Sequence, residues 1–369
     1  MRNVYVQGVG MVKCGRYTEK IETKAAEACM NALQDAGMKW RDVQAAYAAH
    51  VMQGPSAGQK VFSQIGITGL NVTNVENACA SGSTALHHAY YDIAYGKYDV
   101  VLVVGFEKMK RGVIDANKGE ERSYEDKLGL QVMPSEYAQK AQRHMYEYGT
   151  TPEQMAKVSV KNHKNGTYNP YAHYQKNFTL EEVLQSRPIA DPLTLLQACP
   201  TSDGAAAVIL VSENVMKKNR NQDPIKFVGT AVQTETILED IDLTTRTANI
   251  AYQMAGLGPK DISLAEVHDA FTIGELLHYE ALGFCAPGES GSLIDEGVTE
   301  ITGSLPVSPS GGLQSRGHPL GMTGVAQVCE IAWQLRGEAG QRQVQNNPKV
   351  GLAHTQGAGG ICAVNIFSL

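Results

Sequence analysis

This sequence lacks several features that would place it in a familiar class of protein. None of its apolar runs approaches the length of a transmembrane helix, so we expect no membrane insertion. Its formal net charge is −6, which argues against nucleic acid or an anionic membrane as the main partner. Its 37 glycines form no low-complexity tract, and they must therefore serve turns and close backbone approaches.

Paired cysteine motifs are also missing. The seven cysteines are odd in number and scattered, and none belongs to a CxxC pair. This pattern favours reduced thiols in a cytosol over a disulfide framework, and it predicts no metal site. The start MRNVYVQGVG has no signal-peptide core, and the end NIFSL is not a peroxisomal address. We therefore expect a cytoplasmic protein.

The pattern of strands and helices occurs twice. In the first half, a strand at Val4–Val12 precedes a helix at Ile21–Ala36. In the second half, a strand at Lys226–Val232 precedes a helix at Ala248–Ala255. With 369 residues, the chain has room for two domains or for one duplicated unit.

Matching segments support the duplication. AGMKWRDVQAAY after the first helix corresponds to AGLGPKDISLAE after the second, and TSDGAAAVILVS corresponds to TQGAGGICAVNIFS near the C-terminus. The continuous apolar run at Asp99–Gly105 is typical of a strand covered on both sides. We predict an α/β protein of two similar packed units, residues 1–222 and 223–369.

A different kind of segment interrupts the first unit at about residues 110–190. It is richer in charge and tyrosine, and it contains helical patterns at Tyr137–Tyr148 and Pro152–Asn165. Long insertions of this kind usually cover a functional site. A surface elaboration or a dimer contact is the open alternative.

Cys79 lies where a strand gives way to a helix, in the segment NVENACASGS. A helix beginning near Ala80 to Ser83 places the thiol at a helix N-terminus. The free backbone N–H groups and the helix dipole there favour a thiolate and lower a thiol pKa. We therefore consider Cys79 a candidate nucleophile, and a small buried cysteine at a tight junction is the competing interpretation.

Two histidines occur in positions suited to act on that thiol. His318 lies between Gly317 and Pro319 at a second expected helix start, the counterpart of the Cys79 junction. If the two units pack about a pseudo-two-fold axis, thiol and imidazole meet and form an activated nucleophile. His268, in AEVHDAFTIGELL, follows an apolar strand and precedes another helix.

The C-terminal stretch GLAHTQGAGG supplies further candidates. His354 opens a glycine-rich turn, and the glycines there expose backbone N–H groups that can bind an oxyanion. We predict this role for the turn that contains Gly357, Gly359 and Gly360. A simple strand reversal explains the same glycines equally well.

Taken together, these motifs resemble the thiolases over nearly the whole chain. NACASGS is similar to their nucleophile segment, RGHPLGMTG to their Gly-His-Pro segment, and ACPTSDGAAAVILVS to the strand that closes the first half. HDAF and FTLEEVLQSRPIADPLTLL resemble the branch of sterol-carrier-protein-type thiolases. The resemblance implies the thiolase fold, a five-layered α-β-α-β-α arrangement with an inserted loop domain.

The resemblance also implies a reaction. Cys79 would attack the 3-oxo carbon of a 3-oxoacyl-CoA after His318 takes its proton, and His268 with His318 would stabilise the enolate. The N–H groups of Cys79 and Gln356 would hold the thioester oxygen. Coenzyme A is then a substrate, no cofactor is bound permanently, and the same atoms can run the reverse condensation.

One departure from the family pattern concerns the second catalytic cysteine. The terminal turn has His354 where many thiolases have cysteine, and the HDAF box has Ala270. Either His354 replaces that cysteine, which we favour because histidine titrates in the useful range, or another residue such as Cys285 comes near. The departure also leaves open a retro-aldolase that cleaves β-hydroxyacyl-CoA.

The resemblance extends to partners and substrates. We expect a homodimer and a small partner protein with a zinc ribbon and an OB fold. An aromatic cluster, Tyr168, Tyr171, Tyr174 and Phe178, is predicted to line an aromatic or branched acyl pocket. Benzoylsuccinyl-CoA and acetoacetyl-CoA thiolases of this type are both compatible with the sequence.

Overall fold

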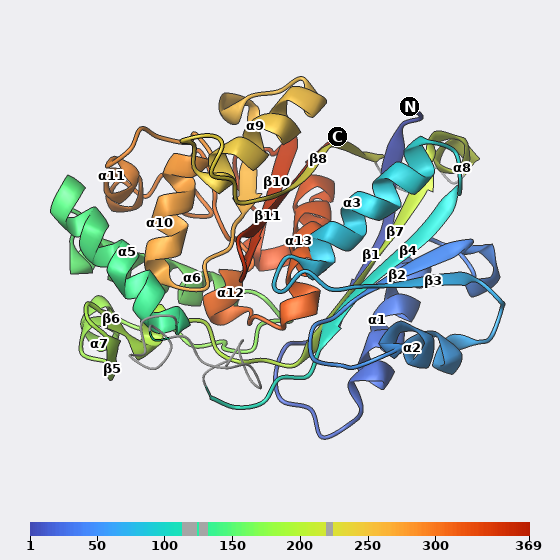
Figure 1. Ribbon diagram of the computed structural model, residues 1–369, viewed down its shortest axis with the longest axis horizontal. Helices are drawn as coiled ribbons and strands as arrows, with labels where there is room; N and C mark the ends of the chain where they lie inside the picture. The colour runs from blue at the N-terminus through green and yellow to red at the C-terminus, as the bar shows by residue number, and fades with distance from the viewer. Residues whose placement is uncertain (113–123, 125–131, 219–223) are drawn as a thin grey trace.

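A nine-stranded sheet runs through the whole computed structural model, which describes residues 1–112, 124, 132–218 and 224–369 (Figure 1). Its order is β3-β2-β4-β7-β1-β8-β11-β10-β9. The strands are β1 (Val4–Met11), β2 (Ala45–Ala49), β3 (Asn71–Val75), β4 (Val100–Glu107), β7 (Gly204–Ser212), β8 (Ile225–Thr234), β9 (Leu264–Glu266), β10 (Val350–Gly357) and β11 (Ile361–Ser368). A separate two-stranded sheet pairs β5 (Pro188–Ala190) with β6 (Leu193–Thr194).

Helices cover both faces of this sheet, and two of them lie between its two halves. They are α1 (Ile21–Asp35), α2 (Ala57–Ile65), α3 (Ser81–Ala94), α5 (Met133–Tyr148), α6 (Pro152–Thr167), α7 (Leu180–Leu184), α8 (Glu213–Lys218), α9 (Leu243–Ala255), α10 (Thr272–Ala281), α11 (Ser290–Asp295), α12 (Gly312–Ser315) and α13 (Thr323–Arg336). None of the helices in the described ranges is long and apolar enough to cross a membrane.

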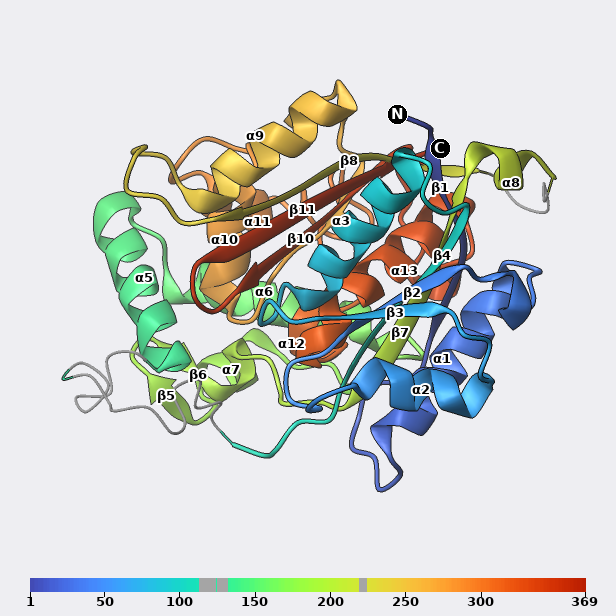
Figure 2. The same ribbon diagram turned by 45° about the vertical axis from the view of Figure 1, so that its right-hand side comes forward.

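The layers follow from where the apolar faces lie. Helices α3 and α13 occupy the middle, between one half of the sheet (β3, β2, β4, β7 and β1) and the other (β8, β11, β10 and β9). Helices α1 and α2 lie outside the first half, and α9 lies outside the second (Figure 2). Val325 on α13 belongs to one buried cluster with Val101 of the first half and Ala353 of the second. The predicted five-layered α/β fold is thereby confirmed.

Both halves repeat one local plan. Helices α1 and α9 are followed by Gly37 and Gly256, whose φ angles of 64° and 68° lie in the left-handed region that glycine tolerates. A short 3₁₀ helix comes next in each half, Trp40–Asp42 or Pro259–Asp261, and leads into β2 or β9. The two halves join where β1 pairs with β8. The predicted boundary between residues 222 and 223 falls outside the described residues.

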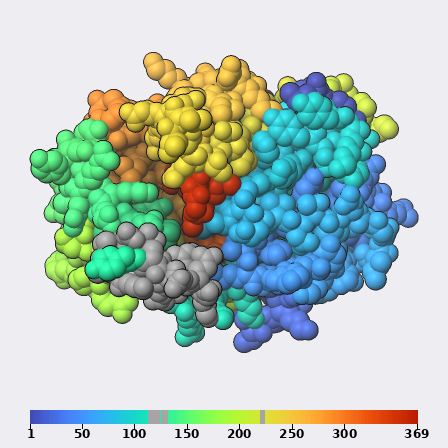
Figure 3. All heavy atoms as spheres, in the orientation of Figure 1, coloured from blue at the N-terminus to red at the C-terminus, as the bar shows by residue number. Residues whose placement is uncertain are grey.

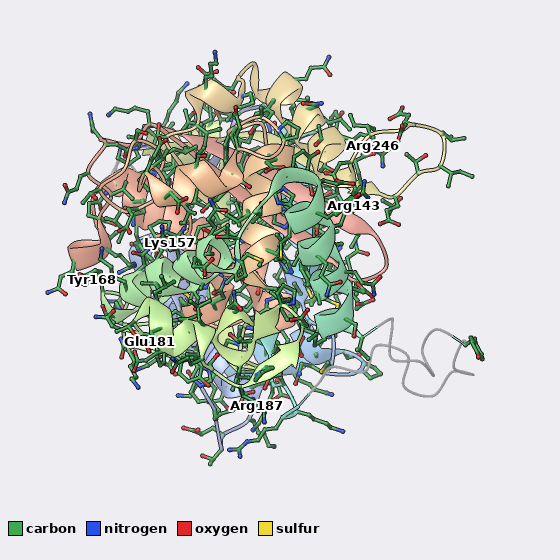
Figure 4. All side chains as sticks on the ribbon, turned by 90° about the vertical axis from the view of Figure 1, so that its left-hand side faces the viewer. Arg143, Lys157, Tyr168, Glu181, Arg187 and Arg246 are labelled. Carbon is green, nitrogen blue, oxygen red and sulfur yellow. The ribbon has the colours of Figure 1, made fainter. Side chains whose placement is uncertain are left out.

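The insertion in the first half forms one side of the molecule. Helices α5, α6 and α7 make this side, and their outer surface is polar, with Arg143 and Glu181 exposed and Lys157 half-buried there (Figure 4). The inner surface of α6 is different, because Lys161 and Asn162 are buried against the second half of the chain. This inward contact brings the insertion next to the loops that carry His268 and His318.

Candidate active site

Cys79 lies in a tight turn between β3 and α3. Ala78 before it has a φ of 48°, a left-handed conformation that is uncommon for a residue with a Cβ. The turn is held by two side chains: Glu76 accepts a hydrogen bond from the Ala78 N–H at 2.8 Å, and Ser81 Oγ accepts one from the Asn77 N–H at 2.8 Å. Local strain that is fixed in this way is typical of a functional site.

His318 is oriented by the residues that follow it. Its Nδ1 lies 2.8 Å from the hydroxyl of Thr323, and that hydroxyl donates to the carbonyl of Pro319 at 3.1 Å. Because the Thr323 proton is committed to Pro319, the hydroxyl accepts from Nδ1–H. His318 therefore carries its proton on Nδ1, and the lone pair on Nε2 is available to act as a base.

Three of the predicted side chains meet at one point. Ligand atoms of Cys79, His268 and His318 all lie within 4.8 Å of one another. The two imidazole rings are edge to face, with centroids 5.0 Å apart and an interplanar angle of 81°. The three residues come from both halves of the chain, as the pseudo-symmetric packing predicts. Among the described residues, this is also the group whose spacing suits a metal ion.

Burial determines the protonation of the group. It raises the pKa of the Cys79 thiol to about 12, although the N–H of Ala358 and the residue's own N–H oppose the shift. The prediction that a helix N-terminus lowers this pKa is wrong, because loss of solvent outweighs the backbone dipoles. Burial also lowers the pKa of His268 to about 3 and that of His318 well below its usual value. The resting site therefore holds a neutral thiol and two neutral imidazoles.

The C-terminal hairpin lies against the nucleophile turn. Gln356 and Gly357 end β10, and a Cβ added to Gly357 would come 2.8 Å from the carbonyl oxygen of Asn77. The N–H that reaches the Cys79 sulfur belongs to Ala358, a residue that sequence patterns did not single out. In Figure 3 the red C-terminal segment shows at the surface in a hollow between the yellow, green and blue parts of the chain.

His354 occupies a different place from the one predicted. It lies inside β10 and not at the opening of the turn, and its side chain is fully buried. Its Nδ1 accepts the backbone N–H of His268 at 3.4 Å, and its Nε2 lies 3.4 Å from the hydroxyl of Thr244. Its ring also packs edge to face on His278, with centroids 4.3 Å apart. These contacts place the His354 ring against the backbone of His268.

A buried polar network connects the two histidine loops. Asp269, next to His268, accepts the N–H of Leu313 at 2.8 Å and the amide of Asn162 at 2.9 Å. The same amide donates to Glu275 at 2.7 Å. Burial raises the pKa of Asp269, and the neighbouring Glu275 raises it further. Asn162 was not predicted as a functional residue, since a lone asparagine on a helix carries no sequence signal of this contact.

His268 has one ring nitrogen available. Its Nδ1 is buried and has no hydrogen-bond partner among the described residues. A buried polar atom without a partner is costly unless a ligand or water satisfies it. Because the ring lies beside Cys79 and His318, it is suited to bind a negatively charged or carbonyl oxygen of a substrate held at the thiol.

Two other predicted features lie away from this group. Cys285 is next to Glu280 and Glu289, whose charges act on its thiol. The aromatic cluster is split: Tyr168 and Tyr171 line a surface cavity of about 360 Å³ with Trp333, at the far end of α13 from His318. Tyr174 and Phe178 instead pack on His163, with centroid distances of 6.3 and 4.8 Å. The prediction of a single aromatic cluster is therefore wrong.

Comparison with protein families gives two matches that together span most of the chain. A model described as the N-terminal domain of thiolase matches residues 9–214, and one described as thiolase C-terminal domain-like matches residues 229–367. Among solved structures, an Ltp2-ChsH2(DUF35) aldolase aligns over 99% of this chain and 97% of its own, with a TM-score of 0.87 and 27% identity. Human mitochondrial 3-ketoacyl-CoA thiolase aligns over 100% and 98%, with a TM-score of 0.73 and 21% identity, which shows the fold.

Curated relatives share more of the sequence. An acetyl-CoA acetyltransferase of Methanothermobacter thermautotrophicus is 43% identical, with both chains fully covered. Sterol carrier protein 2 of Gallus gallus is 39% identical over all of this chain and 72% of its own length. The benzoylsuccinyl-CoA thiolase subunit BbsB of Thauera aromatica is 38% identical over 97% of this chain and 95% of its own.

Proposed function

The chain belongs to the thiolase family, and on that premise we propose that it cleaves a 3-oxoacyl-CoA by thiolysis, or runs the reverse condensation, through an acyl-Cys79 intermediate. As a member of that family it is an acyltransferase. The observation that carries the assignment of roles is the meeting of Cys79, His268 and His318 within 4.8 Å. The nucleophile, the base and the hydrogen-bond donors are all groups of the protein, so the reaction requires no resident cofactor, and coenzyme A enters as a substrate.

The first half-reaction begins from the neutral pair. His318 Nε2 takes the thiol proton as the sulfur attacks the 3-oxo carbon, and the C2–C3 bond then breaks to leave acyl-Cys79 and an acyl-CoA enolate. The position of the His268 ring beside Cys79 and His318 supports a role in holding the enolate oxygen. The N–H groups of Cys79 and of Gln356 or Gly357 are assigned to the thioester oxygen of the acyl-enzyme.

Mass spectrometry tests the covalent step directly. Incubation with a 3-oxoacyl-CoA in the absence of coenzyme A is expected to add one acyl group to Cys79. Cys79→Ala should abolish the adduct and His318→Ala should slow its formation by at least about 100-fold. Cys285→Ala is the matched control, and it should behave as wild type. A wild-type protein that turns over substrate without any adduct on Cys79 would contradict the mechanism.

A retro-aldolase is the second candidate function, supported by the high structural similarity to the Ltp2-ChsH2(DUF35) aldolase. Such an enzyme would cleave a β-hydroxyacyl-CoA by removing the hydroxyl proton, without a covalent intermediate. Cys79→Ala discriminates between the two. It should destroy thiolase activity completely, whereas a retro-aldolase would retain cleavage of a β-hydroxyacyl-CoA.

The acyl group can be identified with a substrate panel. The relatives named above support two candidates, acetoacetyl-CoA and 2-benzoylsuccinyl-CoA. Rates with coenzyme A should be compared across these two and a series of straight-chain and branched 3-oxoacyl-CoA esters. A kcat/KM at least 100-fold higher for one ester would define the substrate class.

We further propose a cytoplasmic homodimer that binds a small zinc-ribbon and OB-fold partner. The end strand β3 leaves one edge of the sheet for pairing with a second copy. The structure named as an Ltp2-ChsH2(DUF35) aldolase supports a second type of subunit. Size-exclusion chromatography with light scattering tests the dimer. Co-expression with a neighbouring small gene product tests the partner, and full activity of the chain purified alone would argue against an obligatory one.

A further inference from the structure

The proposed reaction requires more proton transfers than the meeting of Cys79, His268 and His318 supplies. When the C2–C3 bond breaks, His318 already holds the proton of Cys79, and the C2 carbon of the enolate still needs one. The incoming coenzyme A thiol must then lose a proton before it can attack the acyl group. A second acid and base near the bond that breaks would perform both transfers.

We infer that the thiol of Cys199 is this second acid and base, an inference that rests on the proposed function. Its backbone N–H donates to the carbonyl of Ala270 at 2.8 Å, and Ala198 forms a bridge with Phe271. Residues 198–199 therefore run alongside the box that contains His268. Cys199 is only partly buried, whereas Cys79 beside it is 8% exposed.

Electrostatic neighbours place the two thiols in one environment. The charge of Cys79 is among those that act on Cys199, together with that of Asp269. Burial raises the pKa of Tyr137, and the charges of Cys79 and Cys199 raise it further. Tyr137 itself stacks on Phe271, with ring centroids 4.6 Å apart. Cys79, Cys199 and Tyr137 therefore lie close enough for their charges to act on one another, and the backbone contacts of residues 198–199 place Cys199 beside the box that contains His268.

The other candidates for this role have different surroundings. Cys285 is next to two glutamates, and Cys362 contacts the hydroxyl of Thr244 at 3.8 Å. His354 lies behind His268 and accepts its backbone N–H. Burial raises the pKa of Cys199 itself, so its thiol is protonated at rest and can donate.

The proton balance closes with Cys199 in this role. Its S–H protonates C2 as the enolate collapses, which releases the first acyl-CoA and leaves a thiolate. That thiolate takes the proton of coenzyme A, whose sulfur attacks the acyl-Cys79 carbonyl. The Cys79 sulfur leaves and recovers its proton from His318. Both thiols and the imidazole finish in their starting states.

Substitution of Cys199 separates this role from that of Cys79. With acetoacetyl-CoA and coenzyme A, Cys199→Ala should lower kcat by at least about 100-fold. Exchange of the C2 hydrogens of acetyl-CoA in deuterated water should fall by the same factor. Alkylation of Cys79 by iodoacetamide should keep its wild-type rate, because the Cys79 and His318 pair is intact. Cys199→Ser, which keeps the shape but is a much weaker acid, should remain at least tenfold slow.

Several results would overturn the inference. One is Cys199→Ala with kcat within twofold of wild type, which would leave His318 as the sole acid and base. Another is full activity in Cys199→Ser, which would indicate hydrogen bonding only. Slow alkylation of Cys79 in Cys199→Ala would indicate a structural role. A loss of exchange in His354→Ala with intact alkylation, while Cys199→Ala is active, would assign the role to His354. A failed proposed function is a separate outcome, seen as the absence of an acyl adduct on wild-type Cys79.

Discussion

Gly324 lies in the first turn of α13. Replacing it with alanine, which adds a single methyl group, should lower the activity strongly. A Cβ built there lies 2.5 Å from the backbone nitrogen of Ser83 on α3, where ordinary contacts begin at 3.4 Å. Gly324→Ala therefore requires the two helices to separate by about 0.9 Å. Since Ser83 is four residues after Cys79 and Gly324 is six after His318, this separation moves the nucleophile and the base apart.

The expected loss in rate follows from that displacement. A misplacement of about 1 Å in a reacting pair costs roughly 100-fold in rate, and overpacking of a buried contact costs about 1 to 3 kcal/mol of stability. We expect Gly324→Ala to lower kcat about 100-fold. The thiol of Cys79 should also react more slowly with iodoacetamide, because His318 no longer reaches it.

The same helix provides a matched control. Gly337 follows the last turn of α13 with a φ of 73°, and a Cβ built there meets no atom of the described residues within 4 Å. Gly337→Ala should lose about 1 to 2 kcal/mol from left-handed strain and keep kcat within twofold. Urea unfolding measures both stability losses, and steady-state kinetics measures both rates. A Gly324→Ala enzyme with wild-type kcat, or equal rate losses in both variants, would refute the reasoning.

Substitutions at three further positions test the buried polar groups around the site. Thr323→Val should lower kcat by about 10- to 100-fold, because His318 loses the acceptor that fixes its tautomer. Thr323→Ser should restore most of the rate. Asn162→Leu should cost about 2 to 3 kcal/mol in urea unfolding, since two buried carboxylates lose a donor, and an unchanged midpoint would contradict that network. His278 is buried with a pKa well below its usual value because of burial and the nearby His354. The unfolded chain therefore binds a proton below pH 6.5 that the folded one does not, and stability falls as pH falls. His278→Leu should reduce that slope by up to about 1.4 kcal/mol per pH unit, as read from melting curves between pH 7 and 5.

Much of the fold could be predicted because it depends on local pattern. The helix expected at Ile21–Ala36 is present as Ile21–Asp35, and the strand expected at Asp99–Gly105 is present as Val100–Glu107. The half-chain repeat also placed Cys79 and His318 at corresponding helix starts, α3 at Ser81 and α13 at Thr323. Their meeting follows from pseudo-symmetry, which the matching segments reveal without coordinates.

Other features depend on tertiary structure and left no pattern to detect. His354 precedes a run of glycines, and the glycines suggested a turn, yet β10 continues through it until Gly357. Cys199 lies in the segment that resembles the last strand of the first half of thiolases. Its contact with Ala270, which is distant in the sequence, is seen only in the folded structure. The pKa of Cys79 was predicted in the wrong direction because sequence shows the helix start and conceals the burial.

That burial changes how the nucleophile must work. A thiol whose pKa is raised to about 12 beside an imidazole whose pKa is well below normal does not exist as a thiolate and imidazolium pair at rest. Charge must therefore form only as the sulfur attacks, when the 3-oxo group of the substrate begins to carry the negative charge and donors such as the Ala358 N–H can act on the sulfur. Neutral resting groups are thus compatible with catalysis, because the interactions that separate the charges are made in the transition state.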